Sequence, residues 1–165
     1  MYFFLIASGF CVVYAFLYLL FPLFFTGSRV PVSKRSLLSI ACIILVWVVV
    51  WHISGQIPDL DWSNRFLHVF GGGFLSSLVC FLVVLDSRLS ITKFRFFVFS
   101  FLIVLSLGVA NEILEYLLQE FTSLSFANTA NDTWMDLISN TVGALIALVC
   151  LTPFIRPAEK GKISL

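Results

Sequence analysis

Five long apolar segments, separated by short polar ones, make up almost the whole chain. Each is long enough to cross the hydrocarbon core of a bilayer as a helix, for which about 20 residues are needed. The predicted spans are residues 2–25, 37–53, 65–85, 96–119 and 134–154. This pattern predicts an all-α, polytopic membrane protein whose residues 1–165 form a single membrane domain.

The composition agrees with this class of protein. Hydrophobic residues make up 60% of the 165 residues and charged residues only 12%, and the mean hydropathy is +1.04. A soluble domain carries about 25% charged residues. The first apolar segment lacks the basic start and the small-residue cleavage pattern of a signal peptide. No nucleic-acid-binding motif is present, and we expect membrane lipids as the surroundings.

The basic residues predict which side of the membrane each loop faces. Nine of the ten lie in the first loop, the third loop and the C-terminal tail, which a five-span chain places on one side. They are Arg29, Lys34, Arg35, Arg88, Lys93, Arg95, Arg156, Lys160 and Lys162. By the positive-inside rule we expect the N-terminus outside and the C-terminus in the cytoplasm. Trp51, Trp62 and Trp134 then lie where an outer aromatic belt is expected.

The four cysteines suggest neither a disulfide framework nor a zinc site. Cys11, Cys42, Cys80 and Cys150 lie singly inside apolar runs, with no CxxC partner and no nearby histidine. We expect each of them to be a small, buried apolar residue.

Polar residues recur at helical spacing at three predicted span ends, all on the side predicted to be outer. The first face is Asp61, Arg65, His68 and Gly72; the second is Asn111, Glu112, Glu115 and Gln119, with Gly108 beneath; the third is Asp132, Asp136, Asn140 and Gly143. Residues three or four apart share one helix face. At about 1.5 Å per residue, these faces reach about 10 Å below the outer helix ends. Because an ionised group facing lipid costs about 3 kcal/mol, we expect the faces to meet in a polar cavity open toward the outer leaflet.

These residue types suit cation binding or proton transfer. The candidate metal ligands and catalytic groups are His68, Glu112, Glu115 and Asp136. Oxygen ligands favour magnesium, calcium or manganese, and the imidazole also allows zinc. Without a metal, clustered carboxylates can share a proton. The candidate substrate-binding residues are Arg65 for an anionic group, Asn140 for orienting a carboxylate or the substrate, and Asp132.

Each candidate also has a purely structural interpretation. Asp132 can cap the last span, Arg65 can be the counter-ion of a buried carboxylate, and His68 can be a hydrogen-bonded interior histidine. The glycines can serve close helix packing. We expect Asp61 and Glu120 to be solvated charges.

The motifs DxxxRxxH, ExxE and NDxxxDxxxNxxGA follow one another in an order that resembles the VanZ-like superfamily and the nearby YjdF-type group. An Asp-then-His element, a later Glu and a terminal DxxxNxxG element recur in those families in that order. The matching positions are Asp61, His68, Glu112, Glu115, Asp132, Asp136, Asn140 and Gly143. The resemblance implies a protein of the bacterial cytoplasmic membrane, with some relatives tied to glycopeptide-antibiotic resistance. The Arg that commonly precedes the last Asp is missing from TANDTWMD, and Arg65 is the candidate to replace its charge.

Three functions fit this sequence. The leading hypothesis is a membrane-embedded enzyme, with or without a divalent cation, that acts on an anionic lipid or a cell-envelope precursor. An ion-coupled transporter could use the same groups, although no inverted repeat and no broken span is visible. A non-catalytic subunit that binds a partner could use the polar faces only to hold its helices together. The sequence leaves the substrate, the metal and the oligomeric state open.

Overall fold

The computed structural model describes residues 2–27, 34–121 and 130–155, and these form helices and no strand. The elements are α1 (Tyr2–Thr26), α2 (Lys34–Ser54), α3 (Leu60–Phe66), the π-helix η1 (Leu67–Phe74), α4 (Leu75–Asp86), α5 (Lys93–Phe121), α6 (Ala130–Leu151) and the 3-10 helix η2 (Thr152–Phe154). With α3, η1 and α4 counted as one, five helices of the described chain are long and apolar enough to cross a membrane. The prediction of an all-α protein with five spans is confirmed.

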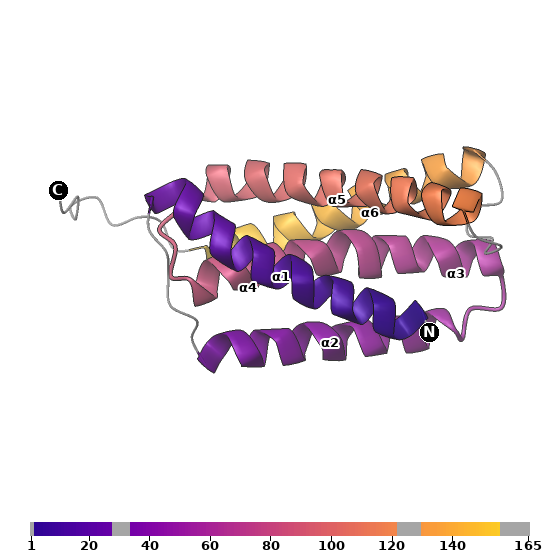
Figure 1. Ribbon diagram of the computed structural model, residues 1–165, viewed down its shortest axis with the longest axis horizontal. Helices are drawn as coiled ribbons and strands as arrows, with labels where there is room; N and C mark the ends of the chain where they lie inside the picture. Colours follow the sequence, from indigo (N-terminus) through magenta and orange to yellow (C-terminus); the bar gives the residue numbers. More distant parts are fainter. Residues whose placement is uncertain (1, 28–33, 122–129, 156–165) are drawn as a thin grey trace.

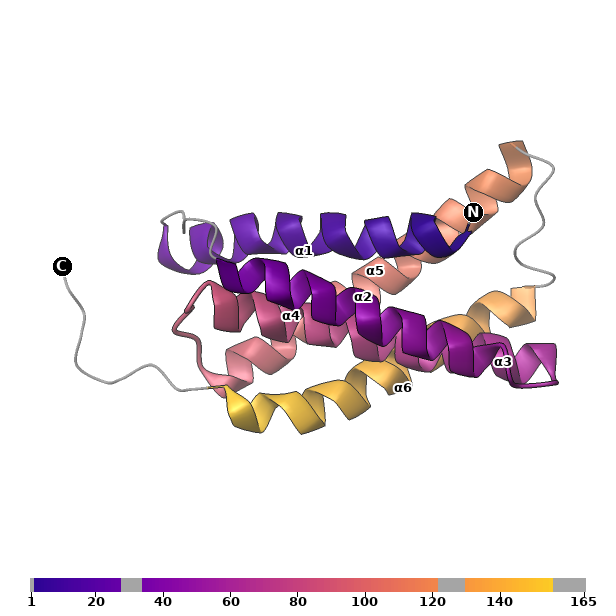
Figure 2. The same cartoon turned by 90° about the horizontal axis from the view of Figure 1, so that it is seen from below.

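The orientation in the membrane stays a prediction. Four of the basic residues on which it rests, Arg29, Arg156, Lys160 and Lys162, lie outside the described residues. The spans run along a common axis and alternate in direction (Figure 1). At one end of the bundle α1, α3 and α6 begin and α2 and α5 end. We call this the polar end. Figure 2 shows α5 running obliquely across the bundle, so that its last turns diverge from α6 at the polar end.

The third span is one continuous helix whose winding changes along its length. It starts at Leu60 and not at residue 65, because Asp59 caps it by accepting a hydrogen bond from the Trp62 backbone N–H at 3.0 Å. Three other spans begin three or four residues before their apolar segments, and α6 ends at Leu151, where η2 continues to Phe154. From Leu67 to Phe74 the winding widens into a π-helix over the sequence LHVFGGGF. Such wide turns are rare in proteins, and those that occur often lie at functional sites.

The third span also supplies the centre of the bundle. Leu75, Val79 and Val83 of α4 are completely buried and pack in one cluster with Tyr14 of α1 and Ile43 of α2. The outward-facing side chains of the described helices are mostly apolar and exposed, as expected of a bundle surrounded by lipid.

The closest helix contact joins η1 to α6 and depends on glycines. A side chain at Gly73 would overlap the backbone of Asn140, and one at Gly143 would overlap the backbone of Val69. Small residues let two helix backbones touch in this way. The contact fixes the height of η1 relative to α6, and therefore the heights of the polar residues that each carries.

The cysteines differ in part from the expectation. All four are free, and Cys80 is buried as predicted. Cys42 and Cys150 are instead exposed on the outside of the bundle, and Cys11 is half-buried. The prediction of burial was wrong for these three, because a helix position that faces lipid accepts a small apolar residue as readily as an interior one.

Candidate functional site

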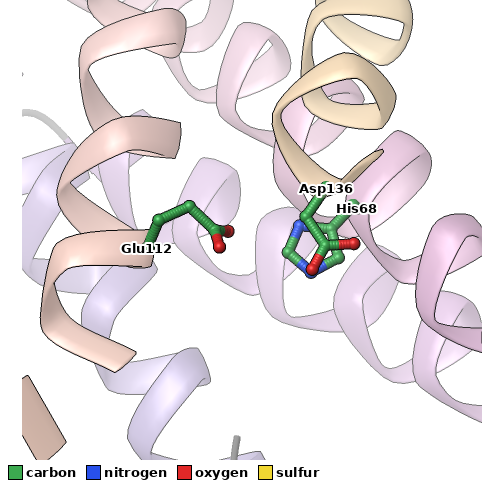
Figure 3. Close-up of side chains that lie close together, drawn as sticks. All are labelled: His68, Glu112 and Asp136. Carbon is green, nitrogen blue, oxygen red and sulfur yellow. The ribbon is translucent and has the colours of Figure 1, made fainter. Parts of the chain in front are cut away.

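Three predicted site residues from three different helices come together near the polar end. His68 on η1, Glu112 on α5 and Asp136 on α6 each place one ligand atom within 4.8 Å of the other two. Figure 3 shows the Glu112 carboxylate pointing from α5 toward the His68 imidazole and the Asp136 carboxylate. Glu112 is 8% exposed and Asp136 is 3% exposed. We call these three residues the ligand cluster.

The spacing of the ligand cluster is close to that of a metal site. Ligand atoms lie about 2.0–2.2 Å from a bound zinc or magnesium ion, so that two ligands of one ion are at most about 4.4 Å apart. The observed limit of 4.8 Å therefore requires only a small closing movement of the side chains. An imidazole nitrogen with two carboxylates is a donor set that suits zinc or manganese as well as magnesium.

Asn140 holds the His68 ring from the side opposite to Asp136. Its Nδ2 lies 3.2 Å from His68 Nδ1, and His68 Nε2 lies 3.4 Å from Asp136 Oδ2. If the Asn140 amide turns by 180°, its oxygen accepts from Nδ1–H and leaves Nε2 able to bind a cation, as in most metal-binding histidines. Gly72 and Gly108 make room for this amide, because a Cβ at either position would press on it.

Asp136 is held from α3 by two donors. Its Oδ1 accepts hydrogen bonds from Asn64 Nδ2 at 3.0 Å and Arg65 Nη1 at 3.2 Å. Arg65 also reaches Asp132, through Nη2 to Oδ1 at 3.3 Å and through Nη1 to the backbone oxygen at 3.4 Å. The sequence left two roles open for Arg65, a counter-ion of a buried carboxylate and a substrate-binding residue. These contacts are those of the counter-ion. Asp132 lies in the first turn of α6, where the helix dipole favours a negative charge.

Glu112 carries a carboxylate oxygen that the described residues do not satisfy. Its Oε1 is buried and has no hydrogen-bond partner among them. A buried polar atom without a partner costs about 1–3 kcal/mol, and more when it is charged. The acidic groups also outnumber the one guanidinium nearby, Arg65; they are Asp132, Asp136, Glu112 and Glu115. A cation between Glu112 and Asp136 would supply both the missing partner and part of the missing charge.

A cavity of about 500 Å³ borders the ligand cluster. Its polar lining residues are Asn64, His68, Ser76, Asn111, Glu115 and Asn140, and the rest of its lining is apolar or glycine. Glu115 accepts a hydrogen bond from Asn111 Nδ2 at 2.7 Å. The two glutamates, which the sequence treats alike, therefore differ: Glu112 belongs to the ligand cluster and Glu115 to the cavity wall.

Asn64 is the site residue that sequence reasoning missed. It precedes His68 by four residues, so the spacing that grouped the other polar positions could have included it. Asp61 and Glu120, expected to be solvated charges, are both exposed. The structure thus brings His68, Glu112 and Asp136 into one cluster, with Asn64, Arg65, Asp132 and Asn140 around it and Glu115 beside it.

The fold and the site together define a multi-pass membrane protein with a buried cluster of polar side chains near one end. Residues 3–156 match the model of the family described as "Predicted membrane protein (DUF2238)", and the chain belongs to this family. The family is YjdF-like, which agrees with the YjdF-type part of the resemblance. The family's description names no activity. No curated protein and no solved structure matches the chain at a significant level.

Proposed function

We propose that this protein is a membrane-embedded enzyme that binds a divalent cation through His68, Glu112 and Asp136 and acts on the head group of an anionic lipid or cell-envelope precursor. The observation that carries the proposal is the meeting of three ligand atoms within 4.8 Å, from three helices, beside a cavity. Helix packing alone gives no reason for a buried carboxylate with an unpartnered oxygen, since apolar residues pack as well at lower cost.

The surrounding residues suit such chemistry. A bound cation would polarise a phosphoryl or carbonyl oxygen of the head group and make water a better nucleophile. Glu115, in the cavity wall, would exchange protons with water or with the leaving group. Asn140 would orient His68, and Arg65 would hold Asp136 in place. The resemblance to VanZ-like proteins and the charge pattern support a substrate in the outer leaflet of the cell envelope.

Metal analysis of the purified protein tests the cation site. The protein is equilibrated with magnesium, manganese or zinc in detergent, washed, and assayed by elemental mass spectrometry. We expect about one ion per chain in the unaltered protein, and affinity lower by at least about tenfold in Glu112→Gln and Asp136→Asn. Glu120→Gln is the matched control, because it makes the same change at an exposed position of the same helix.

The outcomes of this experiment are distinct. Equal and negligible metal in the unaltered protein and in Glu112→Gln would rule out the cation site. Equal, stoichiometric metal in both would mean that the ion binds elsewhere. A thermal unfolding curve for each variant shows whether a loss of metal reflects the site or a loss of the fold.

A further inference from the structure

The cavity changes its chemistry along the bundle axis. Nearest the polar end all but one of its polar lining residues occur, beside the apolar residues Leu67, Ala110 and Leu114; these polar residues are Asn64, His68, Asn111 and Glu115 of the third and fourth spans, with Asn140 of α6. Further into the bundle the same two spans contribute only glycines, apolar residues and one hydroxyl: Gly71, Gly72, Ser76, Val104, Leu107 and Gly108. In the third span the polar lining residues come first along the chain, and in the fourth span they come last. Because these spans run in opposite directions, both place their polar residues at the same end of the cavity.

Asn140 of α6 adds its one amide beside Gly72 and Gly108, and the wall that the first two spans contribute is apolar. It consists of Gly9, Phe10 and Val13 of α1 with Trp47 and Trp51 of α2. The rings form a continuous aromatic surface, with centroid distances of 5.8 Å from Phe10 to Trp47 and 5.7 Å from Trp47 to Trp51. The family resemblance that indicated the site residues assigned no role to these two spans. In the structure they line the cavity.

The dimensions match one leaflet of a membrane. From Glu115 to Val104 the cavity follows α5 for eleven residues, or about 16 Å at 1.5 Å per residue. Half of a hydrocarbon core is about 15 Å thick. The volume of about 500 Å³ is that of a small-molecule site, which excludes a partner helix as the occupant.

From this gradient we infer that the cavity holds one amphiphile, with its anionic head group at His68, Asn111 and Glu115 and an apolar chain between α1, α2 and η1. This inference rests on the proposed function, because the cation of that site would offset the charge of the Glu115 carboxylate beside an anionic head group. It adds that the substrate is bound by its chain as well. Lipid tails are as apolar as the cavity wall, so the chain alone gains little by entering. The head group therefore supplies the preference for the cavity over bulk lipid. The cavity wall has to accommodate the chain that is attached to this head group.

Gly9 offers a way to fill the cavity without disturbing the helices. A Cβ at Gly9 would meet nothing within 4 Å, although the residue lines the cavity. Gly9→Leu therefore places a side chain into the space that the chain would occupy. Ala15→Leu is its control, because Ala15 is exposed on the outside of the same helix. Val13→Phe and Val12→Phe are a second pair, with Val13 in the wall and Val12 exposed at 67%.

Quenching of Trp47 fluorescence measures occupancy of the cavity. Trp47 lines the cavity and is 3% exposed, so we use a variant in which the other tryptophans are replaced by Phe. The protein is reconstituted in phosphatidylcholine vesicles and titrated with hexadecyl phosphate brominated at mid-chain. We expect quenching that saturates at a low mole fraction, and binding at least about tenfold weaker in Gly9→Leu and Val13→Phe. The two control variants should bind as the parent does, and brominated hexadecanol, which lacks the anionic head, should not saturate.

Other outcomes overturn the inference or separate it from the proposed function. Quenching that rises linearly with mole fraction and is equal in the cavity and control variants would show contact from bulk lipid only, and the inference fails even if the metal assay succeeds. Saturable quenching that is reduced in Gly9→Leu but unaffected by Glu112→Gln and by a chelator supports the chain cavity while the cation site fails. If the Gly9→Leu protein does not fold, the Val13→Phe and Val12→Phe pair decides between the two results.

Discussion

Asp136 is the residue on which the site's electrostatics depend. One of its oxygens faces Asn64 and Arg65 and the other faces His68, in an almost fully buried position. The Arg65 guanidinium is shared with Asp132, so one positive charge serves two carboxylates. A buried ion pair of this kind is costly to break on one side, because the remaining charge is left unpaired.

A double-mutant cycle on Arg65 and Asp136 should show this coupling. We expect Arg65→Met to lower the free energy of unfolding by about 3–5 kcal/mol, because it leaves two carboxylates without their partner. Asp136→Asn should cost less, because Arg65 keeps Asp132. The double variant should recover part of the loss, with a coupling energy of about 1–3 kcal/mol. Denaturant unfolding in mild detergent measures all four species.

The matched cycle pairs Arg65 with Asp61, which lies four residues earlier on the same helix and is exposed. Its coupling energy should not exceed about 0.5 kcal/mol, the value typical of an exposed ion pair four residues apart on a helix. Equal coupling in the two cycles would mean that Arg65 acts through general charge and not through the contact with Asp136, which would leave the guanidinium available to a substrate.

At the scale of the helices, the sequence predicted which faces meet but not how they fit. A period of 3.6 residues was enough to group His68, Glu112 and Asp136, because polar residues inside a membrane must face one another. It could not separate Glu112 from Glu115, which lie only about 60° apart around α5. Their different places follow from the oblique course of α5, and that angle depends on packing between helices and not on any pattern within one (Figure 2).

The π-helix η1 could not be predicted from the sequence for a similar reason. The three glycines Gly71, Gly72 and Gly73 indicated close packing, and the structure gives each a different neighbour. A Cβ at Gly71 would meet the Trp47 ring, one at Gly72 the Asn140 side chain, and one at Gly73 the α6 backbone. Three consecutive residues thus contact three different surfaces. These contacts depend on where the neighbouring helices lie, which a pattern within one segment does not show.

These neighbours predict a graded response to alanine. Gly73→Ala and Gly143→Ala should each destabilise the protein by about 1–3 kcal/mol, because the new methyl group meets backbone atoms that cannot rotate away. Gly9→Ala should be neutral or stabilising by up to about 1 kcal/mol, because it has open space and restricts the unfolded chain. Thermal unfolding of the three variants in one detergent checks the order. Equal destabilisation by all three would show that loss of glycine, and not the η1–α6 contact, controls stability.

For the whole molecule, the distribution of charged and aromatic residues predicts which leaflet the site faces. Apart from Arg65, the described Lys and Arg residues lie at the bundle end opposite to the ligand cluster; they are Lys34, Arg35, Arg88, Lys93 and Arg95. The exposed Trp51, Trp62 and Trp134 lie at the polar end. By the positive-inside rule we expect the polar end, with the ligand cluster and the polar part of the cavity, to face the outside. This orientation determines whether the substrate is an external envelope component or a cytoplasmic lipid.

Cysteine labelling in intact cells tests the orientation directly. In a background without the native cysteines, Gln56→Cys lies between α2 and α3 at the polar end, and Ser90→Cys lies between α4 and α5 at the other end; both positions are exposed. We expect a membrane-impermeant maleimide to label Gln56→Cys in intact cells and Ser90→Cys only after permeabilisation, because the basic loops are retained in the cytoplasm. The reverse pattern would place the polar part of the cavity in the cytoplasmic leaflet. The cation site and the chain cavity would survive that result, since both depend on contacts within the bundle, but the substrate would then have to be sought among cytoplasmic lipids.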